Sequence, residues 1–157
     1  MRIQRISSKN TSLNQLPKVA KMLEINKRTV LLDYGCGGYS KFQEFTEAQG
    51  GKFYGYDPYW KSPEENLRAL NCNPNLVVCA NVLNVIMEEE ILKSILLQLR
   101  SFGCEVYIQV YEGNKTGIGK KTSRGFQRNQ KAEEYKELIC KYFGKVERKG
   151  NVFICNI

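Results

Sequence analysis

The stretch that decides the fold is Thr29-Val30-Leu31-Leu32-Asp33-Tyr34-Gly35-Cys36-Gly37-Gly38-Tyr39-Ser40. Thr29–Asp33 is a short apolar run closed by an acid and glycines, a pattern typical of a buried parallel strand. Ser40, with Gln43 three residues later, predicts the capping box of a following helix. Glycines between a strand and a helix let a ligand approach the backbone closely, and the helix start adds free N–H groups. The stretch therefore predicts a strand, a ligand-binding turn and a helix.

A second strand and a second acid follow at Lys52–Tyr56 and Asp57. The sequence contains only two aspartates, Asp33 and Asp57, and each falls where a predicted strand ends. In an open α/β sheet this edge is where ligands bind. Asp57 lies 22 residues beyond Gly35, a spacing at which a carboxylate can accept the hydroxyl protons of a ribose.

The rest of the sequence alternates predicted helices and strands. Ser62–Glu65 is a strong helix start, with an N-cap residue, a proline and two acids in the first turn. The other expected elements are a helix from Asn14–Pro17 to Glu24, strands at Leu76–Ala80 and Glu105–Tyr111, helices at Glu88–Ser101 and Asn129–Phe143, and a hairpin of Lys145–Arg148 with Asn151–Ile157. This order predicts an α/β fold: a single Rossmann-like domain over residues 1–157, with a mostly parallel sheet and a C-terminal antiparallel hairpin. Residues 1–28 are its N-terminal helical segment.

The composition excludes several kinds of site. The 157 residues include no histidine, which removes the commonest general base and the Ser-His-Asp and Cys-His arrangements. The six cysteines form no Cys-x-x-Cys pair, so we expect reduced thiols and no metal site. No apolar run reaches the roughly 18 residues that span a bilayer, and residues 1–10 lack the apolar core of a secretory signal. We therefore expect a cytoplasmic protein without a membrane partner; the sequence leaves the oligomeric state open.

The net charge of +8 is concentrated at the two ends of the chain. Residues 1–30 contain seven Lys/Arg and one Glu, and residues 113–157 contain eleven Lys/Arg and four Glu. Residues 31–112 contain six Lys/Arg and eleven Asp/Glu. Basic ends around an acidic middle favour an anionic partner that faces the ends, although an ordinary basic surface gives the same composition.

Three motifs together resemble class I (Rossmann-like) S-adenosylmethionine-dependent methyltransferases. They are Leu32–Gly37 (LDYGCG), Gly55–Pro58 (GYDP) and Asn81–Ile86 (NVLNVI). The resemblance covers nearly the whole chain, and it implies an enzyme that transfers a methyl group from S-adenosyl-L-methionine. It also implies that the first motif holds the methionine end of the cofactor and that the acid after the second strand holds the ribose. The cofactor-binding candidates are Asp33, Gly35, Cys36, Gly37, Asp57, Pro58 and Asn81.

The segment Cys79–Ile86 resembles the family's fourth-strand motif, whose loop lies under the transferred methyl group. The candidate catalytic residues are Asn81, Asn84 and Tyr111. Methyl transfer from a sulfonium is an in-line displacement, and holding the acceptor about 3–3.5 Å from the methyl carbon supplies much of the acceleration. Such a reaction needs no strong protein base when the acceptor is a free lone pair, which is compatible with a protein that lacks histidine.

The sequence also departs from the family pattern. The family's third glycine falls at Tyr39, and only 18 residues separate Asp57 from Leu76. That length is too short for the usual helix, strand and second helix, so we expect the third strand to be reduced or missing. A dinucleotide site fits less well, because its third glycine would fall at Ser40 and the chain is too short for a further substrate domain.

Val82–Ile86 (VLNVI) together with Thr122–Gln127 resembles a group of small methyltransferases encoded in bacterial and phage genomes, some beside DNA-modification genes. The basic loop, residues 113–128, suits phosphate contact with base stacking. Its substrate-binding candidates are Lys120, Lys121, Arg124, Phe126 and Arg128. We therefore expect DNA or RNA as the acceptor and partner. The loop is equally compatible with a solvated surface segment, or with an Arg124 clamp on a small carboxylate or phosphate.

Two familiar DNA-methylation chemistries are disfavoured. The fourth-strand position reads Asn81-Val82-Leu83-Asn84, without the Pro-Pro of aminomethylating enzymes, and no cysteine follows a proline as in cytosine-C5 enzymes. Three hypotheses remain: methyl transfer to nucleic acid, methyl transfer to a small anionic metabolite or a protein, and a non-catalytic module that binds the cofactor or associates with DNA.

Overall fold

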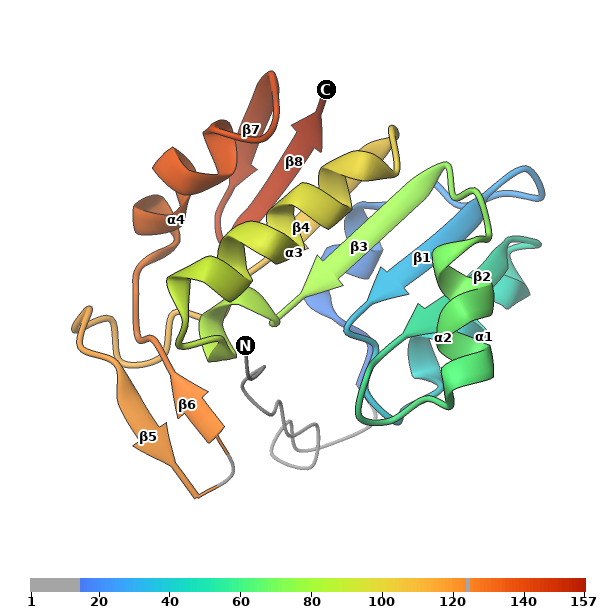
Figure 1. Ribbon diagram of the computed structural model, residues 1–157. Helices are drawn as coiled ribbons and strands as arrows, with labels where there is room; N and C mark the ends of the chain where they lie inside the picture. The colour runs from blue at the N-terminus through green and yellow to red at the C-terminus, as the bar shows by residue number, and fades with distance from the viewer. Residues whose placement is uncertain (1–14, 124) are drawn as a thin grey trace.

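The computed structural model describes residues 15–123 and 125–157. Figure 1 shows the elements in chain order, and their bounds are as follows. They are η1 (Lys18–Met22), β1 (Val30–Tyr34), α1 (Lys41–Ala48), β2 (Lys52–Tyr56), α2 (Pro63–Leu70), β3 (Leu76–Ala80), η2 (Leu83–Val85), α3 (Glu89–Ser101), β4 (Glu105–Gln109), β5 (Lys120–Thr122), β6 (Gly125–Gln127), α4 (Ala132–Cys140), β7 (Lys145–Lys149) and β8 (Val152–Asn156). Here η1 and η2 are short 3₁₀ helices.

The main sheet has six strands in the order β2-β1-β3-β4-β8-β7. β2, β1, β3 and β4 are parallel, and β8 and β7 are antiparallel to their neighbours. The α/β class, the mostly parallel sheet and the C-terminal hairpin predicted from the sequence are therefore confirmed. The adjacent strands β1 (VLLDY) and β3 (LVVCA) read as nearly continuous apolar runs because both faces of the sheet are covered there.

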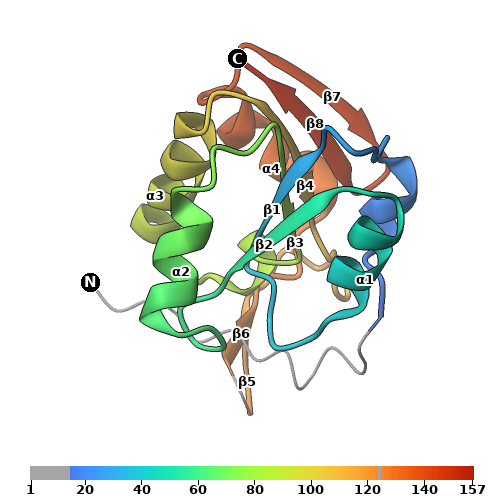
Figure 2. The ribbon, with the colours of Figure 1, turned by 90° about the vertical axis from the view of Figure 1, so that its right-hand side faces the viewer.

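Helices pack on both faces of the sheet, as Figure 2 shows. α2, α3 and α4 cover one face, where Leu92 and Leu96 of α3 and Ile139 of α4 are fully buried. η1 and α1 cover the other face, where Val19 packs with Leu31 and Phe42. This arrangement leaves the carboxyl ends of β1, β2, β3 and β4 at one edge of the molecule.

The third strand of the usual methyltransferase sheet is missing within the described residues. The sheet ends at β2, and the eight-residue helix α2 makes the whole crossover to β3. α2 begins as predicted: the Ser62 side chain accepts a hydrogen bond from the backbone N–H of Glu65, and the Glu65 side chain accepts one from the backbone N–H of Ser62. The short spacing between Asp57 and Leu76 thus predicted the topology correctly.

The structure corrects three local predictions. Ser40 precedes α1 at φ −113° and ψ −4° and makes no side-chain capping bond, so the capping box with Gln43 is not formed. The helix expected from Asn14–Pro17 to Glu24 is the five-residue η1, because the Pro17 and Leu23 backbones that flank it are extended. Residues 1–14 of the predicted N-terminal helical segment lie outside the described residues.

The third correction concerns the basic loop. It contains an antiparallel hairpin, in which Lys120 pairs with Gln127 and Lys121 with Phe126. Phe126 packs over Gly119, where a Cβ atom would lie 2.3 Å from the aromatic ring. The alternation of polar residues with one phenylalanine is too short and too hydrophilic to have predicted strands. Figure 1 shows the hairpin beside the edge at which β1 and β3 end.

Among the described residues, no helix is long and apolar enough to cross a membrane. These residues also contain no cluster of three or more histidine, cysteine, aspartate or glutamate side chains that could hold a metal ion.

Candidate functional site

A cavity of about 470 Å³ opens at the carboxyl edge of the parallel strands. β1 contributes Asp33 and the glycine turn after it, and Asp57, Asn81 and Gln109 lie at the ends of β2, β3 and β4. The mouth lies between η1 and the start of α1, and its lining includes Lys18, Lys21, Tyr39, Lys41 and Phe42. The cavity therefore lies where the fold brings the ends of four strands together.

The glycine turn needs glycine at two positions. Gly35 has φ +88° and Gly37 has φ +68°, in the left-handed region that other residues avoid. A Cβ atom on Gly35 would lie 2.4 Å from Cγ2 of Val82, so this glycine also lets the turn touch the loop after β3. The backbone N–H groups of Gly35 and Cys36 donate to the carbonyl oxygen of Tyr56 at 2.7 and 3.1 Å.

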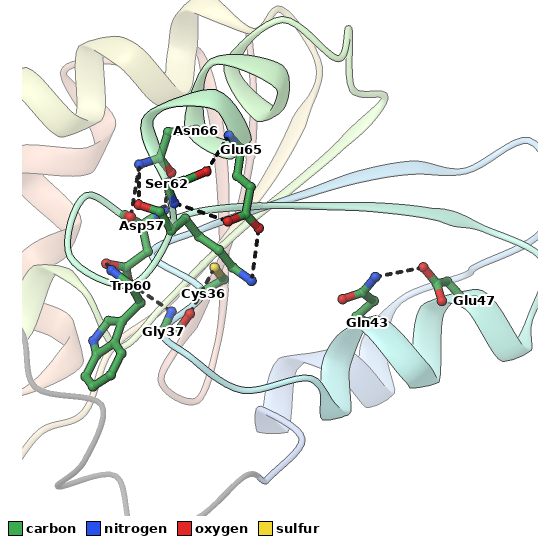
Figure 3. Close-up of polar contacts among 10 residues, drawn as sticks. Cys36, Gly37, Gln43, Glu47, Asp57, Trp60, Ser62, Glu65 and Asn66 are labelled. Carbon is green, nitrogen blue, oxygen red and sulfur yellow. Dashed lines mark hydrogen bonds and ion pairs between the residues drawn. The ribbon is translucent and has the colours of Figure 1, made fainter.

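Asp57 ties the end of β2 to the glycine turn. One carboxylate oxygen accepts the Gly37 N–H at 2.9 Å, and the other accepts the Trp60 N–H at 3.3 Å (Figure 3). The second oxygen also accepts the Tyr59 N–H at 2.9 Å. Asn66 of α2 holds the Asp57 backbone: its side chain accepts the Asp57 N–H and donates to the Asp57 carbonyl. Asp57 is 3% exposed and lines the cavity, so its carboxylate organises the turn at the cavity wall.

Asp33 is a buried carboxyl group on the floor of the cavity. Its pKa is raised to about 7, mainly by burial and then by the charge of Asp57, while Lys61 acts in the opposite direction. Such a group is sensitive to a cation, because a positive charge beside it stabilises the ionised form. Burial likewise raises the pKa of the neighbouring Cys36 thiol, which is therefore uncharged at neutral pH.

Asn81 and Gln109 join the end of β3, the end of β4 and the N-terminal segment. The backbone N–H of Val19 donates to Oε1 of Gln109 at 2.8 Å, and Nε2 of Gln109 donates to Oδ1 of Asn81 at 3.2 Å. The Asn81 N–H donates to the Gln109 carbonyl at 2.8 Å, and Asn81 has φ +61°. The loop after β3 thus has a specific backbone conformation supported by β4.

The other two predicted catalytic residues lie elsewhere. Asn84 is 2% exposed; its Oδ1 accepts the Tyr111 N–H at 3.2 Å, and its Nδ2 donates to Gln127 at 3.2 Å. Tyr111 is 56% exposed. In the described part of the chain neither residue lines the cavity, and Asn84 instead holds the loop after β3 against the hairpin.

Arg128 is not an open substrate-binding side chain. Its guanidinium donates to the carbonyl oxygens of Ile86 and Met87, and to the side chains of Glu89 and Gln130. Only 11% of the side chain is exposed. These contacts use four of the five guanidinium N–H groups and fasten the end of the hairpin to the start of α3. The substrate contact expected from the sequence for Arg128 stays a prediction.

The remaining substrate candidates lie on the hairpin, away from the cavity lining. Lys120 and Lys121 of β5 are exposed, and Phe126 of β6 is half-buried. Arg124 lies outside the described residues. The cofactor candidates other than Pro58 line the cavity, whereas Lys120, Lys121 and Phe126 lie on the neighbouring hairpin.

Sequence reasoning missed Gln109, Asn66 and the η1 lysines. Gln109 could have been found, because it is a polar residue near the end of the predicted strand Glu105–Tyr111, and that end lies at the ligand edge. Asn66 gave no signal, since asparagine on an exposed helix face is common. Lys18 and Lys21 were counted only as part of the N-terminal charge, and their place at the cavity mouth depends on how η1 packs on the sheet. Pro58 is exposed beside Asp57 and does not belong to the lining.

The strand order and the ligand edge define a Rossmann-like α/β fold of the kind seen in S-adenosylmethionine-dependent methyltransferases. The structure is similar to the crystal structure of Burkholderia thailandensis 1,6-didemethyltoxoflavin-N1-methyltransferase with bound 1,6-didemethyltoxoflavin and S-adenosylhomocysteine. The TM-score is 0.60 at 14% sequence identity, over 81% of this chain and 69% of that chain. No family model and no curated protein matches the chain.

Proposed function

We propose that the protein is a methyltransferase that uses S-adenosyl-L-methionine. The observation that carries the proposal is the cavity in which the glycine turn, Asp33 and Asp57 converge. Its volume lies in the range of about 300–1,000 Å³ usual for small-molecule sites. The fold's likeness to a methyltransferase that binds S-adenosylhomocysteine supports the same cofactor.

The residues present fit this cofactor chemically. The carboxylate of Asp57 has about four lone-pair sites and gives three of them to backbone N–H groups, which leaves capacity for a ribose hydroxyl. Asp33 is buried with a raised pKa, and a cationic ligand group would restore its charge. The positive φ values at Gly35 and Gly37 favour glycine, and because glycine has no side chain, the turn leaves space beside its backbone for the cofactor.

When bound, S-adenosylmethionine supplies an activated methyl group on a sulfonium. The protein would contribute position and charge: Asp33 would face the cationic methionine end and Asp57 would hold the ribose. Asn81, the first residue after β3, lines the same cavity. Asp33 lines the cavity with a pKa of about 7, a value that also suits a general base, but we assign it to the methionine end of the cofactor. With Asp33 used in this way, the proposal calls for an acceptor that reacts through a lone pair already free before it binds.

Two acceptor classes have specific support. A small anionic molecule is favoured by Lys18, Lys21 and Lys41 around the cavity mouth, and by the small acceptor in the crystal structure of the similar methyltransferase. A nucleic acid is favoured by Lys120 and Lys121, which are exposed on the hairpin beside the same edge. We place the small anionic molecule first, since its lysines border the cavity itself.

Isothermal titration calorimetry tests the cofactor assignment directly. We expect S-adenosylmethionine and S-adenosylhomocysteine to bind with micromolar dissociation constants. Absence of heat for both ligands at millimolar concentration would overturn the proposal. Radiolabelled S-adenosylmethionine then separates the acceptors: label transferred to a small-molecule fraction supports the first class, label transferred to DNA or RNA supports the second, and no transfer to any fraction favours a non-catalytic cofactor-binding module.

A further inference from the structure

The amide of Asn81 has its orientation determined by a chain of hydrogen bonds that begins outside the cavity. We propose that Gln109 is a positioning residue that turns the Asn81 side chain so that its NH₂ group donates to the carboxylate of the bound cofactor's methionine end. The ligand part of this inference rests on the proposed function; the orientation of the amide does not.

The orientation follows from donors and acceptors alone. A backbone N–H can only donate, so the Gln109 atom 2.8 Å from the Val19 nitrogen must be Oε1. The other end of that amide is then Nε2, which can only donate, so the Asn81 atom 3.2 Å away must be Oδ1. No choice of amide flip satisfies both bonds otherwise. The Asn81 NH₂ group is therefore directed away from Gln109.

The chain of hydrogen bonds from Val19 through Gln109 to Asn81, called the relay below, is held rigidly. Gln109 is 6% exposed, and Val19 of η1 is fully buried against the sheet. A second bond joins the same two residues, because the Asn81 N–H donates to the Gln109 carbonyl at 2.8 Å. Asn81 lines the cavity, and no hydrogen-bond partner for its Nδ2 exists among the described residues. An NH₂ group fixed in a cavity in this way favours a ligand atom that accepts a hydrogen bond.

The strand order indicates which part of the cofactor lies there. Asp57 follows β2 and Asn81 follows β3, and β1 with Asp33 lies between them. A cofactor whose ribose is at Asp57 extends across β1, so that its methionine end reaches Asn81. The carboxylate is the anionic, acceptor-only group of that end, and hydrogen bonds to charged acceptors are stronger than those to neutral ones.

The decisive variant is Gln109→Glu, which keeps size and keeps an oxygen for the Val19 N–H. A carboxylate cannot donate to Oδ1 of Asn81, so the Asn81 amide turns over and donates to the glutamate; its oxygen then faces the ligand carboxylate. We expect S-adenosylhomocysteine to bind at least 10-fold more weakly, as measured by calorimetry. Methylthioadenosine, which lacks the amino-acid part, should bind the variant within 2-fold of its affinity for the parent.

Asn81→Gly supplies the control background, because glycine keeps the backbone at φ +61° and removes the amide. In that background Gln109→Glu should weaken S-adenosylhomocysteine binding much less than it does in the parent, because no Asn81 amide is left to turn over. If Gln109→Glu weakened S-adenosylhomocysteine binding as strongly in the Asn81→Gly background as in the parent, the relay would be overturned. An equal loss of affinity for methylthioadenosine would also overturn it. A second variant, Asn81→Asp, should also weaken S-adenosylhomocysteine about 10-fold, since it replaces the donor without touching Gln109.

A measurement without ligand separates this inference from the proposed function. In ¹H–¹⁵N spectra the Asn81 amide signal is identified by its loss in Asn81→Gly, and Gln109→Glu should shift it strongly. An unmoved signal would show that Gln109 does not orient Asn81. If the signal moves and the parent protein does not bind S-adenosylhomocysteine, the relay stands, and both the proposed function and the ligand assigned to Asn81 fail.

Discussion

Asp57 and Arg128 are two charged side chains near one edge of the sheet, but only Asp57 lines the cavity. Asp57 uses its charge to organise the glycine turn and still lines the cavity. Arg128 uses its charge to hold two carbonyl groups and Glu89, and it lies outside the cavity lining. Both were predicted to bind ligands. The difference shows that a charge at the end of a strand is placed by the strand, whereas a charge in a connecting loop is placed by whatever the loop packs against.

The largest expected effect is on cofactor affinity, and it comes from changing the shape of the glycine turn without changing any charge. Gly35→Ala places a methyl group 2.4 Å from Val82 at φ +88°, so we expect S-adenosylhomocysteine affinity to fall by more than about 100-fold in calorimetry because the turn must shift. The control is Gly103→Ala, which shares the positive φ (+69°) but meets nothing within 4 Å. It should cost about 1–2 kcal/mol of stability and leave affinity unchanged. Equal affinities for the two variants would contradict the structure of the turn.

Asp57→Ala should weaken S-adenosylhomocysteine binding by about 1.5–3 kcal/mol, roughly 10- to 100-fold. Because three backbone N–H groups lose their acceptor, the free energy of unfolding should also fall, as urea denaturation can measure. Asp57→Asn is the matched control: it retains one oxygen for Tyr59 and Trp60 and should lose less stability. Unchanged affinity in the alanine variant would show that the ribose is held elsewhere.

The raised pKa of Asp33 predicts pH-dependent binding. The free protein binds a proton at Asp33 up to about pH 7, and the methionine ammonium favours the ionised carboxylate. Affinity should therefore rise as pH increases through 7, by up to about tenfold per pH unit below the pKa, with proton release seen by calorimetry in two buffers. Asp33→Asn should abolish this dependence.

The same pKa predicts the stability of the free protein. An unfolded Asp33 ionises near its ordinary pKa of 3.8, whereas the folded group resists ionisation up to about 7. The folded state therefore binds more protons between these values, and the contribution of Asp33 to stability is lost as pH rises from about 4 to 7. Urea midpoints of the parent relative to Asp33→Asn across this range check the sign.

In the hairpin region we expect Arg128→Ala to act on stability alone. The side chain is mostly buried, and its donors serve carbonyl and carboxylate oxygens, so the free energy of unfolding should fall by about 2 kcal/mol. Lys121→Ala removes an exposed charge and should stay within about 0.5 kcal/mol of the parent. S-Adenosylhomocysteine affinity should be unchanged in both. A loss of S-adenosylhomocysteine affinity in Arg128→Ala would show that Arg128 contributes to the binding site.

The smallest expected effect on the cofactor comes from removing Lys120, Lys121 and Arg124 together. With a nucleic-acid acceptor, this triple alanine variant should weaken DNA or RNA binding and reduce the salt slope by about one unit for each phosphate that the protein no longer neutralises. Cofactor affinity should not change, since Lys120 and Lys121 do not line the cavity. Identical binding curves for parent and variant would remove the main support for the nucleic-acid acceptor and leave the small anionic molecule.

The sequence by itself determined the fold class, the missing third strand and the meeting of Asp33, Gly35, Gly37 and Asp57. It could do so because these features are local: glycine tolerates positive φ, and strand ends in a parallel sheet share one edge. Ser62–Glu65 predicted its helix start for the same reason, whereas the Ser40 cap failed because the turn before α1 imposes its own backbone angles.

Only the tertiary structure decided how Gln109, Asn84 and Arg128 are used. Gln109 meets Val19, 90 positions away in the chain, and Arg128 meets carbonyl groups more than 40 positions away. The chemical type of a polar side chain defines which hydrogen bonds it can donate or accept. It does not define which partner the folded chain places beside it. The pairing arises when burial forces each donor and acceptor to be satisfied, and that condition exists only in the folded state.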